Sequence, residues 1–134
     1  MPPALLDTDI LSEIFKRKNA NVARRAAAYL GRHRQFSFSA FTLYEVLRGL
    51  KDNQAVAQLQ RFEVFCRRSL ILDVSRPVLE RASDLWPAGR QGGHPHKDAD
   101  LIIAATALEH GRVLITGNTR HFAWIPGLAI DDWR

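Results

Sequence analysis

Three widely separated carboxylates stand where expected strands and helices meet. Asp7 follows a short apolar run, Glu45 lies between the other two in the sequence, and Asp100 opens a helix-like stretch. Asn118 follows a second apolar run. Two carboxylates about 4 Å apart repel by about 4 kcal/mol at an effective dielectric of about 20, so a cluster of three needs a cation. Mg²⁺ and Mn²⁺ prefer such oxygen ligands and keep water positions open for a phosphate. The pattern therefore predicts a carboxylate-lined pocket that holds a divalent metal for phosphodiester chemistry.

Each of these residues also has a purely structural interpretation. Asp7 can cap the helix that follows it, and Asp98 and Asp100 both lie near a helix N-terminus, where capping and the helix dipole favour carboxylates. Glu45 lies off the apolar stripe of its helix and can face either a pocket or solvent. Asn118 is a common turn residue. Spacing alone leaves both interpretations open.

Composition places the chain among folded, intracellular proteins of one domain. It has 134 residues, of which 46% are hydrophobic, and no apolar run approaches the roughly 20 residues that span a bilayer. The N-terminus lacks the basic region and long apolar stretch of a secretory signal. A single cysteine, Cys66, excludes an internal disulfide and a thiolate zinc site. We therefore expect a cytoplasmic protein with no membrane segment.

The charge balance favours a phosphate-bearing partner. Lysine and arginine number 19 against 14 aspartates and glutamates, for a formal charge of +5. If the three carboxylates hold a metal, the rest of the surface is more basic than that total. Basic surfaces bind nucleic acids through release of counterions, so RNA or DNA is the expected substrate class.

Apolar periodicity predicts strands that alternate with helices along the whole chain. The expected strands are residues 3–6, 36–38, 70–72, 113–116 and 128–130. The expected helices cover about 8–16, 21–31, 39–49, 53–68, a stretch after Pro77, and 98–110, with a single helical turn at 118–122. Asn21 and Ser39 are expected to cap the second and third helices, and Gly49 to end the third.

This alternation predicts a single α/β domain over residues 1–134, a sandwich with a mainly parallel central sheet flanked by helices. In such folds ligands bind outside the carboxyl ends of the strands. Asp7 and Asn118 both fall there.

Four blocks of the sequence resemble one family. They are residues 5–13 (LLDTDILSE), 39–49 (SAFTLYEVLRG), 100–107 (DLIIAATA), and 114–122 (LITGNTRHF) followed by 125–128 (IPGL). Together they resemble the motifs of PIN-domain ribonucleases, specifically the VapC toxins of bacterial VapBC toxin–antitoxin pairs. The blocks occur in the family's order and span nearly the whole chain, which makes the set specific although each block alone is weak.

The resemblance implies a three-layer PIN-like domain whose metal ligands are Asp7, Glu45 and Asp100, with Asn118 as a fourth, polar position. Asp98 lies two residues before the matching acid and is a second-rank candidate. The bound ion would be Mg²⁺, with Mn²⁺ as the alternative. The activity would be hydrolysis of RNA, such as a tRNA or rRNA, that inhibits translation.

Three neighbouring residues complete the expected site. Thr8 and Thr116 are expected to orient the carboxylates through their hydroxyls. Asp9 stands where the family commonly has asparagine, and we expect it to form hydrogen bonds at the helix start rather than to share the pocket. Arg48, on the helix of Glu45, is expected to pair with that residue or to contact phosphate. The resemblance also implies a homodimer, a VapB-like antitoxin and a larger toxin–antitoxin assembly.

Two alternatives compete with this interpretation. Asp7 and Asp9 after an apolar strand also resemble the motif of haloacid-dehalogenase-type phosphatases, in which Asp7 would be the nucleophile and Asp9 the acid/base. In that family the late acidic motif follows a strand that ends in Ser or Thr, whereas here Asp98 and Asp100 precede it. The other alternative is a non-catalytic PIN-like domain that binds RNA or a partner without cutting.

Overall fold

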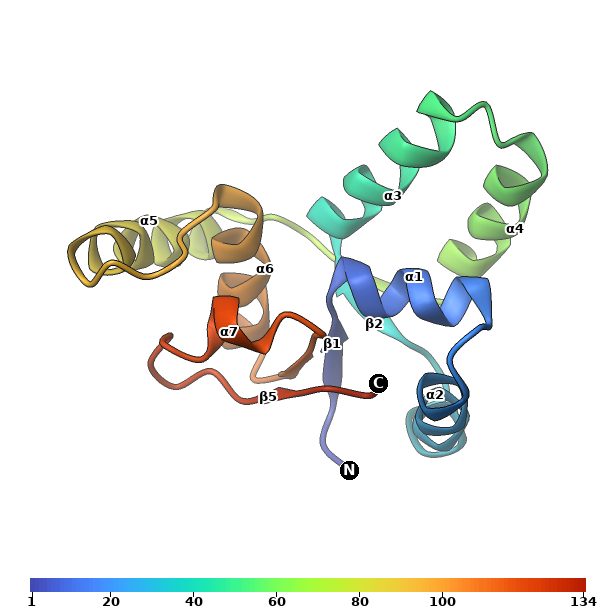
Figure 1. Cartoon of the computed structure of the whole chain (residues 1–134), viewed down its shortest axis with the longest axis horizontal. Coiled ribbons are helices and arrows are strands. Elements are labelled where there is room, and N and C mark those ends of the chain that lie inside the picture. Colours follow the sequence, from blue (N-terminus) through green and yellow to red (C-terminus); the bar gives the residue numbers. More distant parts are fainter.

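The computed structural model describes residues 1–134 and contains a parallel sheet surrounded by helices (Figure 1). The strands are β1 (Ala4–Leu6), β2 (Ser37–Ser39), β3 (Leu70–Leu72), β4 (Val113–Ile115) and β5 (Ile130–Asp131). The helices are α1 (Thr8–Lys16), α2 (Ala20–His33), α3 (Ala40–Asp52), α4 (Val56–Arg67), α5 (Arg76–Gln91), α6 (Asp98–Glu109) and α7 (Thr119–Phe122).

The five strands lie in the order β3-β2-β1-β4-β5, and every neighbouring pair is parallel. The predicted α/β fold is thus confirmed, with a sheet that is parallel throughout. Leu6, the last residue of β1, pairs with Ile115, the last residue of β4. The residues that follow these two strands therefore start from the same edge of the sheet, although they are more than 100 residues apart in the sequence.

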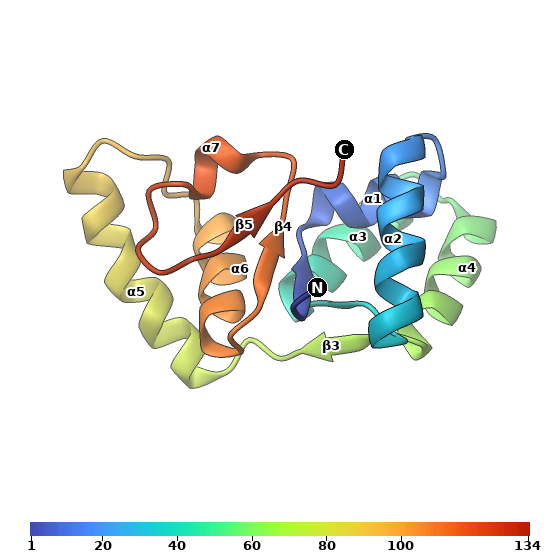
Figure 2. The same cartoon turned by 90° about the horizontal axis from the view of Figure 1, so that it is seen from below.

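Successive side chains of the strands point to opposite faces of the sheet and pack into two separate hydrophobic cores. Ala4, Leu6 and Ile115 point into a cluster that includes residues of α1, α2 and α4, while Leu5 and Leu114 point into a cluster formed with α5, α6 and α7. Figure 2 shows α5 and α6 on one side of the sheet and α2 and α4 on the other. This is the three-layer arrangement expected from the sequence. None of the helices combines the length and apolar character needed to cross a membrane.

Two predicted helix boundaries were wrong. The side chain of Asn19, not Asn21, accepts the hydrogen bond that caps α2, from the backbone N–H of Val22 at 3.1 Å. Gly49 does not end α3, because Leu50 one residue later still packs against the core and the helix runs on to Asp52. Core packing here outweighs the roughly 1 kcal/mol by which glycine disfavours a helix.

The other boundaries differ from the expected ones by at most three residues. Ser39 caps α3 as predicted, since its hydroxyl accepts from the backbone N–H of Phe41 at 3.0 Å. The last strand is Ile130–Asp131 rather than 128–130, because its register is set by pairing with Leu114 and Ile115 of β4.

Candidate active site

Asp7 lies at the carboxyl end of β1, directly beside the residue that follows β4. Its backbone N–H donates to the carbonyl of Ile115 at 2.8 Å, which extends the parallel pairing by one residue. The Thr116 hydroxyl donates to Asp7 Oδ2 at 2.8 Å, and the backbone N–H of Thr8 donates to Asp7 Oδ1 at 2.8 Å. Asp7 therefore serves as the α1 N-cap and also belongs to a polar network that joins two strands.

The surroundings of Asp7 oppose its ionisation. The residue is only 6% exposed, and its pKa is raised from 3.8 to about 7, mainly by burial and then by the charge of Asp9. Asp100 adds a smaller repulsion, while the hydrogen bonds from Thr116 and Thr8 act in the opposite direction. Burial and the neighbouring negative charges thus favour the protonated form of Asp7 up to about neutral pH.

Glu45 reaches this network from α3. The Thr8 hydroxyl lies 2.7 Å from Glu45 Oε1 and 3.1 Å from the hydroxyl of Thr42. Since the backbone N–H of Thr8 already donates to Asp7, Thr8 links the two carboxylates. Arg48 lies 3.9 Å from Glu45, which is a long ion pair between partly exposed groups. The hydrogen bonds expected for Thr8 and Thr116, and the pairing expected for Arg48, are all present.

Asp100 lies in the first turn of α6, on the other side of Asp7. Its Oδ2 is 3.0 Å from Nδ1 of His121, a residue of α7. The carboxylate is close enough to contribute to the raised pKa of Asp7. Asp100 is thus held by His121 and lies near enough to Asp7 for the two charges to interact.

Asp9 makes more contacts around Asp7 than the sequence predicted. Its Oδ1 accepts from the backbone N–H of Ile10 at 2.7 Å, which is the helix-start hydrogen bond that was expected. Its Oδ2 also accepts from the backbone N–H of Gly117 at 2.9 Å, and its charge raises the pKa of Asp7. Burial raises the pKa of Asp9 itself. Asp9 therefore adds to the negative pocket as well as holding the loop after β4.

The side chains of Asp98 and Asn118 stand apart from this network. Asp98 is exposed at the start of α6 and lines an open hollow with Trp86 and the loop 93–97. Asn118 is exposed, and it is its backbone N–H, not its amide, that donates to the Thr116 hydroxyl at 3.0 Å. No three His, Cys, Asp or Glu side chains are grouped tightly enough to form a complete metal-binding set. The structure thus joins Asp7, Thr8, Glu45 and Thr116 by direct contacts and places Asp100 beside them.

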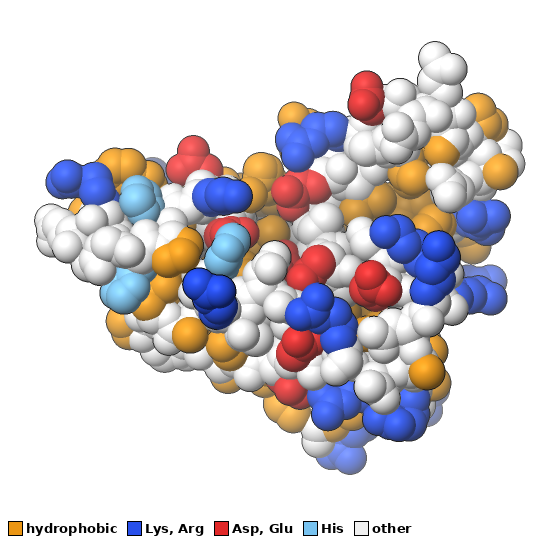
Figure 3. Space-filling model, viewed as in Figure 1, with side chains coloured by type: hydrophobic (Ala, Val, Ile, Leu, Met, Phe, Trp, Pro, Cys, Tyr) orange, Lys and Arg blue, Asp and Glu red, His pale blue; other side chains and the backbone are white.

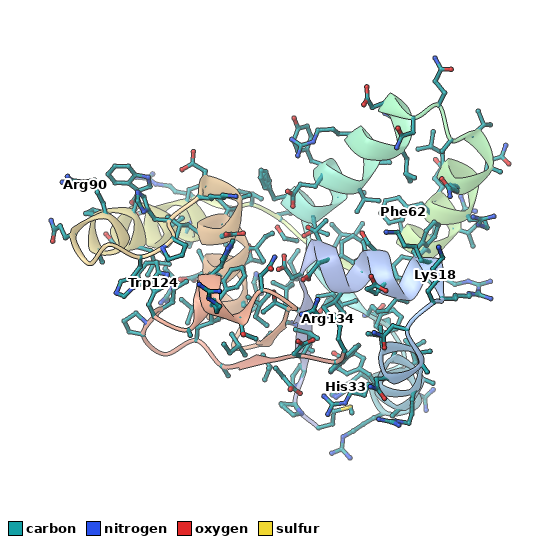
Figure 4. All side chains as sticks on the ribbon, viewed as in Figure 1. Lys18, His33, Phe62, Arg90, Trp124 and Arg134 are labelled. Atoms are coloured by element: carbon teal, nitrogen blue, oxygen red, sulfur yellow. The ribbon has the colours of Figure 1, made fainter.

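Acidic side chains also gather on one part of the molecular surface. Figure 3 shows Asp and Glu side chains in the hollow between the α3 and α6 parts of the surface, with Lys and Arg side chains around it. Arg134, labelled in Figure 4, lies below α1 at the lower edge of this region. A basic protein therefore presents a local group of acidic side chains with basic side chains around it.

Comparison with known proteins decides the family. Residues 4–127 match the PIN domain. The chain belongs to the PIN-domain family. The resemblance predicted from the four sequence blocks is confirmed.

Relatives of this PIN domain are VapC proteins. It is 29% identical over 130 residues to the tRNA(fMet)-specific endonuclease VapC of Shigella flexneri, with 96% of each chain covered. It is 28% identical over 130 residues to Ribonuclease VapC1 of Haemophilus influenzae strain R2866, again with 96% of each chain covered. Among solved structures, the DNA-bound VapBC complex of Salmonella typhimurium matches over the full length of both chains, with a TM-score of 0.87 and 28% identity.

Two contacts of this PIN domain have no local signal in the sequence. His121 contacts Asp100, which lies 21 residues earlier in the sequence. The sequence indicates this pair only through the place of both residues in blocks that resemble the family's motifs. Arg134 donates from Nη2 to the carbonyl of Gly117 at 2.7 Å, and its charge lowers the pKa of Asp9 against the larger effect of burial. A C-terminal arginine is usually a solvated residue, so sequence reasoning had no reason to select it.

Proposed function

We propose that this PIN domain is a metal-dependent endoribonuclease and the toxin of a VapBC-type toxin–antitoxin pair. The observation that carries the proposal is the buried Asp7 carboxylate, which is linked through Thr8 to Glu45 and through Thr116 to the loop after β4. The relatives named as VapC endonucleases and ribonucleases support the same activity.

The residues present fit a hard divalent cation. Every candidate ligand is a carboxylate oxygen, and the raised pKa of Asp7 reflects buried negative charge that a cation would stabilise. Asp7, Glu45 and Asp100 would hold Mg²⁺, or Mn²⁺ in its place. The bound ion would stabilise the negative charge that develops on the phosphate and lower the pKa of water. The proposal requires the three side chains to converge further than they do without the ion.

Side chains around the acids would position them for this task. Thr116 and Thr8 hold Asp7 in one orientation, Thr8 holds Glu45, and His121 holds Asp100. Such partners restrict the rotamers of the ligands and therefore reduce the cost of forming the site. The exposed Asn118 side-chain amide would be available to contact the substrate phosphate.

The basic surroundings would recruit the substrate. The net charge of +5 would attract a polyanion such as RNA. The cation would then lie between the acidic side chains and the phosphate. We propose a structured RNA, such as a tRNA or rRNA, cut in the cytoplasm so that translation stops. The relative from Shigella flexneri is named for tRNA(fMet), and the same class of RNA is the first to test here.

The partner we propose is a VapB-like antitoxin bound to a homodimer of this chain, within a larger toxin–antitoxin assembly. The structures that this PIN domain resembles include VapBC complexes from Salmonella typhimurium and Haemophilus influenzae. An acidic pocket that opens to the surface suits a basic side chain from such a partner, which would occupy the place of the metal and silence the toxin.

Expression of wild type and Asp7→Asn, followed by mapping of cellular RNA ends, tests the proposal. Wild type should slow growth and create new RNA ends at defined sites, and Asp7→Asn should do neither. Asp84→Asn is the matched control, since it removes an exposed acid of α5 that has no part in the network. Identical RNA ends in the wild-type and Asp7→Asn cultures would contradict the proposed activity.

A further inference from the structure

One face of α3 carries two aromatic rings and an arginine beside Glu45. At about 100° per residue, Phe41, Tyr44, Glu45 and Arg48 fall within a stripe roughly 100° wide. The stripe lies on the side away from Leu43, Val46 and Leu50, which pack against the core. We call this set the α3 stripe. Its helix forms one side of the hollow that contains the acids (Figures 1 and 3). The stripe therefore begins at a proposed metal ligand and extends outward from it.

The rings and the guanidinium of the α3 stripe are stacked on one another. The Phe41 and Tyr44 rings are nearly parallel, at 6° with their centroids 5.7 Å apart. The Arg48 guanidinium lies 5.0 Å from the centroid of the Tyr44 ring. Tyr44 is 54% exposed, so a large part of its ring is accessible to a binding partner. The stripe thus offers one exposed ring, Tyr44, which is supported by the half-buried ring of Phe41.

Arg48 is held only weakly in this arrangement. Its side chain is 58% exposed, and its ion pair with Glu45 is long, at 3.9 Å. Exposed ion pairs of this kind contribute little to stability, so the guanidinium is free to move to a stronger partner. A phosphate that approaches the neighbouring site is such a partner, because arginine binds phosphate through paired N–H groups.

We propose that the α3 stripe is a nucleotide subsite for single-stranded RNA next to the cleaved phosphate, in which Tyr44 stacks on a base and Arg48 contacts a phosphate. This inference rests on the proposed function. Planar bases stack on exposed aromatic rings, and an adjacent arginine supplies the charge that the backbone requires. A groove for an amphipathic protein helix is a continuous apolar surface, whereas the charges of Glu45 and Arg48 interrupt this stripe. RNA therefore fits the stripe better than a protein segment does.

Binding of a short single-stranded RNA oligonucleotide to Asp7→Asn protein tests the subsite without cleavage. Tyr44→Ala in this background should weaken binding about five- to 150-fold, the range for loss of one stacked base. Tyr44→Phe should bind within about twofold of the parent, because it keeps the ring. Tyr44→Leu should bind as weakly as Tyr44→Ala, because it keeps apolar area but loses the plane. Leu79→Ala, at an exposed apolar residue of α5, is the control and should change nothing.

Two further readouts separate stacking from charge. The fluorescence of 2-aminopurine in the oligonucleotide should be quenched on binding to the parent protein and not to Tyr44→Ala. Arg48→Ala should reduce the slope of log affinity against log salt by about 0.7, the value for one phosphate contact on a single strand, and Tyr44→Ala should leave it unchanged. In the cleaving protein, Tyr44→Ala should raise KM and leave kcat close to wild type.

Several results would overturn the subsite. One is equal RNA affinity of the Tyr44→Ala and Leu79→Ala proteins, and another is full affinity in Tyr44→Leu. A change of oligomeric state in Tyr44→Ala, measured by sedimentation, would show that the stripe is a protein contact instead. Because binding is measured in a protein that does not cleave, failure of this test and failure of the ribonuclease proposal are separate results.

Discussion

Replacing Asp7 by asparagine tests whether the buried carboxylate imposes a pH-dependent cost on the metal-free fold. Asp7 is almost fully buried, and its pKa is raised from 3.8 to about 7 by burial and by the charge of Asp9. A difference of one in pKa corresponds to about 1.4 kcal/mol. The ionised form of Asp7 therefore destabilises the folded protein by on the order of 4 kcal/mol when no cation is bound.

The direction of the pH dependence follows from the raised pKa. The folded protein holds this proton more tightly than the unfolded chain does, so the contribution to stability is complete below about pH 4. It falls as the pH rises and is lost above about pH 7. Asparagine stays neutral throughout. The free energy of unfolding of Asp7→Asn minus that of wild type should therefore rise by on the order of 4 kcal/mol between about pH 4 and pH 8.

Urea denaturation of both proteins in the presence of a chelator, at a series of pH values, measures this difference. Subtraction cancels the titrating groups that do not interact with Asp7, and the repulsion from Asp9 and Asp100 is part of the measured difference. Loss of an acceptor for the Thr116 hydroxyl adds a destabilisation of about 1 kcal/mol that does not vary with pH. Added Mg²⁺ should raise the stability of wild type at about pH 8 and leave Asp7→Asn unchanged. A difference between the proteins that stays constant across the pH range would refute the reasoning.

Other substitutions test neighbouring contacts. Thr116→Val should reduce kcat/KM for RNA about 10- to 100-fold, because it removes the hydroxyl that orients Asp7, and wild-type kinetics would contradict that role. Asp9→Asn should keep most of the RNA cleavage, whereas loss of activity towards phosphate monoesters in a parallel assay would favour the phosphatase alternative. Tyr29→Phe should lower the free energy of unfolding by about 1–3 kcal/mol in urea without changing kcat, because the buried N–H of Ala4 loses its acceptor, and an unchanged midpoint would argue against that hydrogen bond.

The parts of the site that follow from local sequence were predictable. A carboxylate between an apolar strand and a helix is in the position of a helix N-cap. At the carboxyl edge of a parallel sheet the same carboxylate is also a candidate metal ligand. Asp7 is both, so the two interpretations that spacing left open do not exclude each other. The hydroxyls of Thr8 and Thr116 were predictable for the same reason, because each neighbours a strand end.

The remaining features depend on contacts between distant parts of the chain. Gly49 looked like a helix end by its residue type, and only the packing of Leu50 against the core carries α3 past it. The pairing of His121 with Asp100 and the contact of Arg134 with Gly117 require the folded sheet to bring loops together. Asp9 appeared to be a helix-start residue, and its second oxygen bonds Gly117 only because β1 and β4 are neighbours.

Diffraction from crystals soaked in Mn²⁺, with the anomalous signal used to locate the ion, measures most directly whether three carboxylates share one cation. We expect a single strong peak with oxygens of Asp7, Glu45 and Asp100 all within about 2.2 Å of it. The same peak should be absent from crystals of Asp7→Asn. A peak that contacts none or only one of the three carboxylates would contradict the account.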